Sequence, residues 1–266
     1  MTSVSHESSG LQSSMIFINS RSNNVKIINN DYSDIIYYFH SNLSCSDGFV
    51  FLISLCDAII PVSWYTISSF NNNNSLVYSI NSINTTYVIP DGNYTVLDLY
   101  NLFVANLPFT ISYDSISNKF TFVHSTYNFI LLSTSTCFEL IGLSDGVNHN
   151  SSSFILVFDN QVDLCGTRCL YICTNLQTLN LDSRIGTLSS NILAKIPVNV
   201  DNNNLITHYN YNGFRSLLSN RLINNIQIRI EDDRGRLVNI KNHYSLSIEF
   251  HVIPEKVLVY QNQLMN

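Results

Sequence analysis

Three cysteines at regular spacing are the residues of this sequence that most suggest a chemical site. Cys165, Cys169 and Cys173 are separated by three residues each, and thiolates are common zinc ligands. Structural zinc sites usually combine one cysteine pair with a second pair of Cys or His, and no such second pair follows here. We expect a strand in which Cys169 and Cys173 share the core face of Leu170 and Ile172. The sequence therefore predicts no metal site, no cofactor and mostly unbridged, buried thiols.

Other groups that could perform catalysis form no recognised motif. The chain contains no HExxH, no phosphate-binding GxxxxGK[ST] loop and no GxSxG nucleophile elbow. Asp232 and Asp233 could be half of a carboxylate cluster, but with Gly235 they lie between two alternating segments, which is typical of a tight turn. We predict no catalytic residues and no enzyme; a hydrolase with an unrecognised site is the remaining enzymatic hypothesis. The histidines are scattered, at His6, His40, His124, His149, His208, His243 and His251.

The charge of the chain argues against a nucleic-acid partner. Formal net charge is −6, and there are only 13 Lys and Arg in 266 residues. Phosphate binding needs clustered cations. A basic cluster does occur between Arg215 and Lys241, but Glu231, Asp232 and Asp233 lie within it. We interpret it as a solvated face of mixed sign.

No segment predicts secretion or a membrane span. Residues 1–14 carry neither a basic nor an apolar signal-peptide region and are expected to form a mobile arm. The most apolar run, residues 49–60, is too short and too interrupted to span a bilayer. Asn-x-Ser/Thr triplets, such as those at Asn42, Asn84, Asn93 and Asn150, are expected by chance in a chain so rich in Asn and Ser.

Most of the elements that would position a functional site are expected to be strands. Residues 245–252 alternate, so that Leu246, Ile248, Phe250 and Val252 point to one face. Residues 226–231 alternate likewise, and we expect these two segments to be adjacent antiparallel strands. A dozen further short apolar runs, separated by Asn, Asp, Gly and Ser, predict a mainly β fold, an antiparallel jelly-roll sandwich.

One segment follows a helical period instead. After the turn at residues 90–94, apolar residues recur at helical spacing from Thr95 to Leu107, with Thr95 as the N-cap, Asp98 in the first turn and Pro108 as the stop. A hairpin at residues 115–118 and a short helix at residues 137–143 would complete a small α+β unit. We therefore expect an α+β insertion at residues 85–147 in a jelly-roll domain of residues 15–84 and 148–266.

Several short motifs succeed one another along nearly the whole chain. They are residues 18–22 (INSRS), 60–67 (IPVSWYTI), 89–95 (IPDGNYT), 118–122 (NKFTF), 140–143 (LIGL), 193–198 (LAKIPV), 226–230, 232–235 (DDRG) and 244–250. Their order resembles that of the penton, or minor capsid, proteins of virophages, Polinton-like viruses and related large DNA viruses. The cysteine-rich segment 165–173 and the segment 175–191 depart from this pattern.

The resemblance implies a structural role in a virion. It implies a jelly-roll protein that forms homopentamers at the fivefold vertices of an icosahedral capsid, assembled inside the host cell. The partners would be other copies of itself and a major capsid protein with a double jelly-roll fold; a host receptor or vertex fibre is a further possibility. The alternative from another class is a jelly-roll module that binds glycans or a receptor, because jelly rolls also occur as lectins.

Overall fold

The computed structural model describes residues 12–29, 31–178, 180–182 and 187–256 and divides the chain into two compact units. Unit 1 comprises residues 1–64 and 167–266, and unit 2 comprises residues 65–166. Both are built mainly from antiparallel strands, which confirms the predicted mainly β class. Each unit has its own hydrophobic core.

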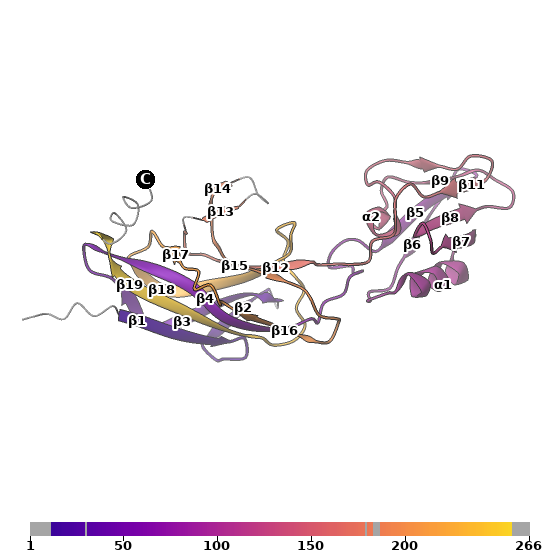
Figure 1. The fold of residues 1–266 in the computed structure, drawn as a ribbon. Helices are drawn as coiled ribbons and strands as arrows, with labels where there is room; N and C mark the ends of the chain where they lie inside the picture. Colours follow the sequence, from indigo (N-terminus) through magenta and orange to yellow (C-terminus); the bar gives the residue numbers. More distant parts are fainter. Residues whose placement is uncertain (1–11, 30, 179, 183–186, 257–266) are drawn as a thin grey trace, which may run out of the picture. The chain divides into compact units, whose positions relative to one another are not determined.

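Unit 1 contains two large sheets, whose strands are labelled in Figure 1. The first, sheet A, has the strand order β1 (Gln12–Asn19), β19 (Ser245–Pro254), β4 (Phe49–Pro61) and β16 (Leu205–Tyr209), and β17 (Ser216–Leu217) also pairs with β4. The second, sheet B, has the order β15 (Ile192–Pro197), β12 (Cys169–Thr174), β18 (Leu222–Glu231), β3 (Asp31–Ser44) and β2 (Val25–Ile28). A separate hairpin joins β13 (Asn180–Asp182) to β14 (Thr187–Ser190).

The core of unit 1 lies between the inward faces of these sheets. Leu246, Ile248 and Phe250 of β19 are buried, as the alternation predicts. They share one hydrophobic cluster with Ile226 and Ile228 of β18. Strands β18 and β19 are nevertheless not neighbours: β18 pairs with β3 and β12, whereas β19 pairs with β1 and β4. The prediction of adjacent strands is wrong because the two apolar rows face each other from opposite sheets.

Unit 2 combines two small sheets with two helices. One sheet has the order β10 (His149–Asn150), β9 (Phe129–Leu131), β5 (Ser75–Ile80) and β6 (Ile83–Val88); the other has β11 (Ile155–Val157), β8 (Lys119–Val123) and β7 (Thr110–Asp114). Their core is rich in phenylalanine, and the rings of Phe122 and Phe158 lie 4.8 Å apart. Phe103 from helix α1 (Val96–Asn106) packs against Phe120 at 5.9 Å. The second helix, α2 (Phe138–Ile141), is short.

Helix α1 begins and ends where its capping residues predict. The hydroxyl of Thr95 accepts a hydrogen bond from the Asp98 amide at 3.1 Å, and the Thr95 amide donates to the Asp98 carboxylate at 3.0 Å. This reciprocal capping box satisfies two amides at the helix start. Leu107 is the C-cap, directly before Pro108. The predicted turn at residues 115–118 also forms, with Asn118 at a positive φ between β7 and β8.

The boundaries differ from those expected for the arm and the insertion. Residues 1–11 of the predicted arm, residues 1–14, lie outside the described residues, while residues 12–14 belong to β1 and pair with β19. Unit 2 extends beyond residues 85–147 on both sides. The physical reason is pairing: β5 lies between β6 and β9 in one sheet, and β11 pairs with β8.

Candidate functional site

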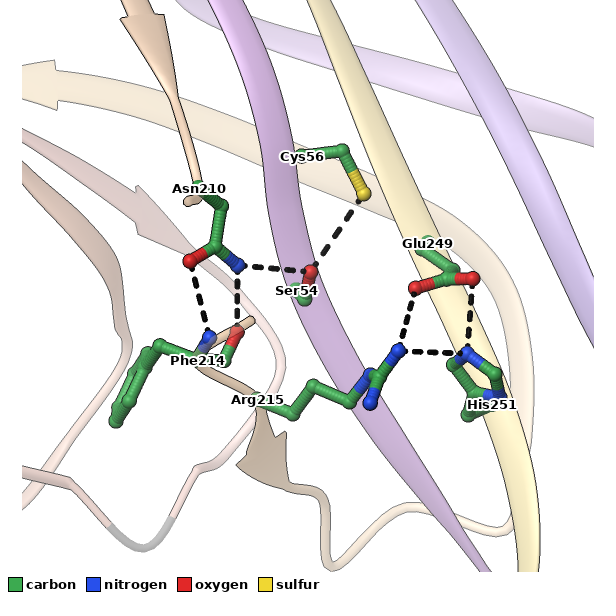
Figure 2. A network of polar contacts seen from close by, with 7 residues as sticks. All are labelled: Ser54, Cys56, Asn210, Phe214, Arg215, Glu249 and His251. Atoms are coloured by element: carbon green, nitrogen blue, oxygen red, sulfur yellow. Dashed lines mark hydrogen bonds and ion pairs between the residues drawn. The ribbon is translucent and has the colours of Figure 1, made fainter. Parts of the chain in front are cut away.

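A network of polar and charged side chains lies on the outward side of sheet A (Figure 2). Arg215, just before β17, donates to the Glu249 carboxylate at 3.3 Å, and its guanidinium lies 3.1 Å from Nε2 of His251. His251 lies 2.8 Å from Glu249 through the same Nε2. Glu249 and His251 alternate with the buried Phe250 on β19, so the strand directs both outward.

The loop that carries Arg215 is held by an asparagine. Asn210 Nδ2 donates to the Phe214 carbonyl at 2.8 Å, and its Oδ1 accepts from the Phe214 amide at 2.9 Å. The same Nδ2 lies 3.3 Å from the hydroxyl of Ser54 on β4, whose oxygen also contacts the Cys56 thiol at 3.6 Å. One side chain therefore closes the loop and ties it to the sheet (Figure 2).

This geometry suits a cross-link between strands better than catalysis. A serine nucleophile needs a hydrogen bond to its general base, and the contacts of Ser54 go to Asn210 and Cys56 instead. Nε2 of His251 cannot accept from Arg215 and donate to Glu249 at the same time, so its protonation selects the partner. The network joins β19 to the loop before β17 across β4.

The sequence analysis did not predict this network, although the strand pattern indicates the positions of two of its residues. The alternation of residues 245–252 places Glu249 and His251 on one face two positions apart. Arg215 is distant in sequence and reaches them only because β17 pairs with β4, with Ser216 opposite Ile53. No local pattern indicates that pairing.

The three regularly spaced cysteines do not form a common site. Cys165 belongs to unit 2 and is exposed, whereas Cys169 and Cys173 lie on β12 in unit 1. All six cysteines of the chain are thiols. Leu170 and Ile172 belong to the core cluster of unit 1. Cys173 is fully buried, as expected, whereas Cys169 at the start of β12 is only half-buried, so the expected core position is wrong for Cys169 alone. Within the described ranges, no three His, Cys, Asp or Glu side chains gather as metal ligands do.

The tight turn predicted at residues 232–235 is confirmed, and its acid is structural. Asp232 accepts from the amides of Arg234 and Arg236, each at 2.9 Å. It also holds the Arg236 guanidinium at 2.7 and 2.9 Å. Asp232 is buried and accepts these four hydrogen bonds, so its carboxylate stabilises the turn in which it lies.

The basic residues near the C-terminus are interleaved with acids, in line with the predicted face of mixed sign. Arg229 pairs with Glu231 at 3.1 Å, and Arg221 pairs with Asp47 at 3.0 Å. These cations already have carboxylate partners within the chain.

The histidines are likewise dispersed. His149 bonds the Ser144 carbonyl, His124 accepts from the amides of residues 126 and 127, and His243 lies 3.2 Å from Ser20. Burial lowers the pKa of His208, and the nearby Asp57 carboxylate partly opposes that shift. His6 lies outside the described residues. Apart from the contact of His251, these side chains serve separate local contacts.

No helix in the described part of the chain is long and apolar enough to cross a membrane. The chain matches no protein-family model and no curated protein sequence. Among solved structures, it is similar to the crystal structure of the selenomethionine-labelled mavirus penton protein, at 11% sequence identity and a TM-score of 0.45. That match covers 91% of this chain and 100% of the mavirus chain. This similarity is too low to assign a function, which is inferred instead from the strand order and the surface of this chain.

Proposed function

We propose that unit 1 is a jelly roll, and strand order supports this. In chain order its eight main strands are β1, β3, β4, β12, β15, β16, β18 and β19. The first, eighth, third and sixth form sheet A, and the fifth, fourth, seventh and second form four neighbouring strands of sheet B. Two interleaved Greek keys produce this order, the arrangement of viral capsid and lectin domains. Unit 2 would then be an insertion between the third and fourth strands.

We infer that the protein is a structural capsid protein, a penton whose homopentamers occupy the fivefold vertices of an icosahedral virion. The strand order of unit 1 is the main support for this proposal, and the order of the sequence motifs supports it as well. Only 12% of the residues are charged, against 12% aromatic, which suits the charge-depleted, aromatic cores of large protein contacts. Its partners would be further copies of itself and a double jelly-roll major capsid protein. Its role would be non-enzymatic, in capsids assembled inside the host cell.

The solution mass of the purified chain tests this proposal. Five chains of 30.2 kDa give 151 kDa, so size exclusion coupled to light scattering should show a peak near that mass. Negative-stain class averages of the same peak should show fivefold rings. A strict monomer across a wide concentration range would contradict self-assembly as the basis of the function.

The second candidate function is a glycan- or receptor-binding module. Its support is the exposure of aromatic side chains among Asn residues, such as Tyr211 between Asn210 and Asn212, since lectins also use jelly rolls. A glycan array would reveal binding. Because a penton could also bind a receptor, the array result must be read together with the mass: a glycan-binding monomer would favour the module.

A further inference from the structure

The two outward faces of unit 1 differ in chemistry. On sheet B, outward polar groups pair with one another: Gln227 donates to Asp34 at 2.6 Å, and Arg229 lies 3.1 Å from Glu231. This face also exposes the ring of Tyr38, at 47%, opposite Asn225 on β18. The outward face of sheet A, which we call face A, instead combines its central ion network with large apolar side chains.

Face A is apolar at both of its sides. Strand β1 contributes outward apolar residues at one side, and β4, β16 and the following loop contribute them toward the other. Their exposed fractions are 45% for Met15, 74% for Phe17, 39% for Ile59, 58% for Leu205, 51% for Tyr209 and 88% for Tyr211. The rings of Tyr209 and Tyr211 lie 5.8 Å apart, so Tyr211 in the loop packs beside Tyr209 at the end of β16.

Strand register places these residues on one surface. Phe17 lies opposite Ser247, Ser247 opposite Asp57, and Asp57 opposite Tyr209. Directly opposed residues in antiparallel pairs point to the same face. Phe17 and Tyr209 therefore end one row that crosses all four strands, and Ile59 lies in the row beside it, opposite Ser245.

The exposed apolar area is that of a protein interface. At about 200 Å² for a fully exposed large side chain, the fractions above correspond to roughly 700 Å². This area is divided between the two sides of face A, with the ion network between them. A standard interface buries about 800 Å² on each partner.

Three ionisable side chains of face A form one network, and a fourth, Asp57, lies outside it in the row between Phe17 and Tyr209. Arg215, Glu249 and His251 contact one another within the chain. Burying an unpaired charge is strongly unfavourable, whereas a hydrogen-bonded ion pair recovers part of its desolvation cost. A partner can therefore cover this network without supplying a counter-charge.

We propose that face A is the surface on which a second copy of this chain docks. This inference rests on the proposed homopentamer and names the contact surface within it. In a closed ring of five, each contact is heterologous, so face A of one copy meets a different surface of the next. Phe17 and Tyr211, the two most exposed aromatic side chains of the face, are the expected anchors.

The test compares assembly of the full-length chain with that of Phe17→Ser, Tyr211→Ser and the double variant. We expect each single change to weaken assembly about 10- to 30-fold and the double change about 100-fold or more, as for aromatic interface anchors. Light scattering across a dilution series gives these values. Thr207→Lys, at an exposed position of β16 opposite Ile59, adds a charged side chain to the face and should also weaken assembly.

Matched controls come from unit 2. Ile116→Ser and Tyr127→Ser remove side chains that are 95% and 48% exposed there, and both should assemble like the wild type. Unchanged circular dichroism spectra and melting temperatures must accompany weakened assembly of the face A variants. Assembly of the double variant and Thr207→Lys at wild-type strength would overturn the assignment of face A while leaving the pentamer intact. A monomeric wild type would overturn both proposals.

Discussion

At the scale of single residues, burial separates the six thiols by reactivity. Cys137 is fully buried in the core of unit 2, and this burial raises the pKa of its thiol to about 12. Cys165 is exposed. Because the thiolate is the reactive form, a buried thiol with a raised pKa is unreactive at neutral pH.

Alkylation should follow this order. With iodoacetamide at pH 8, we expect Cys165 to be modified in the folded protein and Cys137 only after denaturation, as measured by peptide mass spectrometry. Cys165→Ser should remove the fast phase. Equal rates at Cys137 and Cys165 in the folded chain would show that the core of unit 2 opens readily.

At the scale of elements, helix α1 depends on its cap and on one aromatic anchor. Thr95 and Asp98 form the capping box, and hydrogen bonds from Thr95 lower the pKa of Asp98. A carboxyl group whose pKa is lower in the folded than in the unfolded state stabilises the fold above its unfolded pKa. That contribution is lost as the pH falls through the folded pKa.

The cap can be tested by substitution and by pH. Thr95→Ala should lower the free energy of unfolding of unit 2 by about 1 kcal/mol in chemical denaturation at pH 7. Asp98→Asn should flatten the decline of stability with acidification below about pH 4, near the ordinary pKa of aspartate. An Asp98→Asn profile with the full wild-type acid dependence would place that dependence in other carboxylates.

Phe103 is the second determinant of this helix. It is fully buried and contacts Tyr87, Phe120 and Phe122. We expect Phe103→Ala to destabilise unit 2 by about 3–5 kcal/mol, because it removes the apolar contacts and leaves a cavity. The neighbouring Val104 is 48% exposed, so Val104→Ala should change stability by no more than about 0.5 kcal/mol. Similar losses in both variants, measured by urea denaturation, would contradict the anchor role.

At the scale of the whole molecule, the two cores are separate. Every residue of the unit 2 cluster lies between Ile67 and Val162, and every residue of the unit 1 cluster lies outside that range. A unit whose apolar contacts are internal can fold without the rest of its chain.

A chain of residues 65–166 should therefore fold alone. We expect dispersed amide resonances and a cooperative melting transition, and we expect a monomer in light scattering, because face A belongs to unit 1. The variant Phe103→Ala is the matched control and should melt at a lower temperature. A random-coil spectrum of residues 65–166 would show that unit 2 needs unit 1 to fold.

Local patterns in the sequence were sufficient for several elements. The Thr95 cap and Pro108 bound α1, the alternation of residues 245–252 identifies the buried side of β19, and residues 232–235 form the predicted turn. Each of these depends on neighbours within a few positions, through capping, side-chain period or turn chemistry. The mainly β class follows from the same local signals.

Only the tertiary structure decided which strands meet. It separates β18 from β19, joins β5 to β9 and brings Arg215 to Glu249. Pairing and register depend on contacts between residues far apart in the chain, and several partners satisfy the same alternating pattern equally well. The same reason applies to face A: the sequence by itself determined that Phe17 and Tyr209 lie in short runs typical of strands, whereas strand register placed them in one row of a single exposed surface.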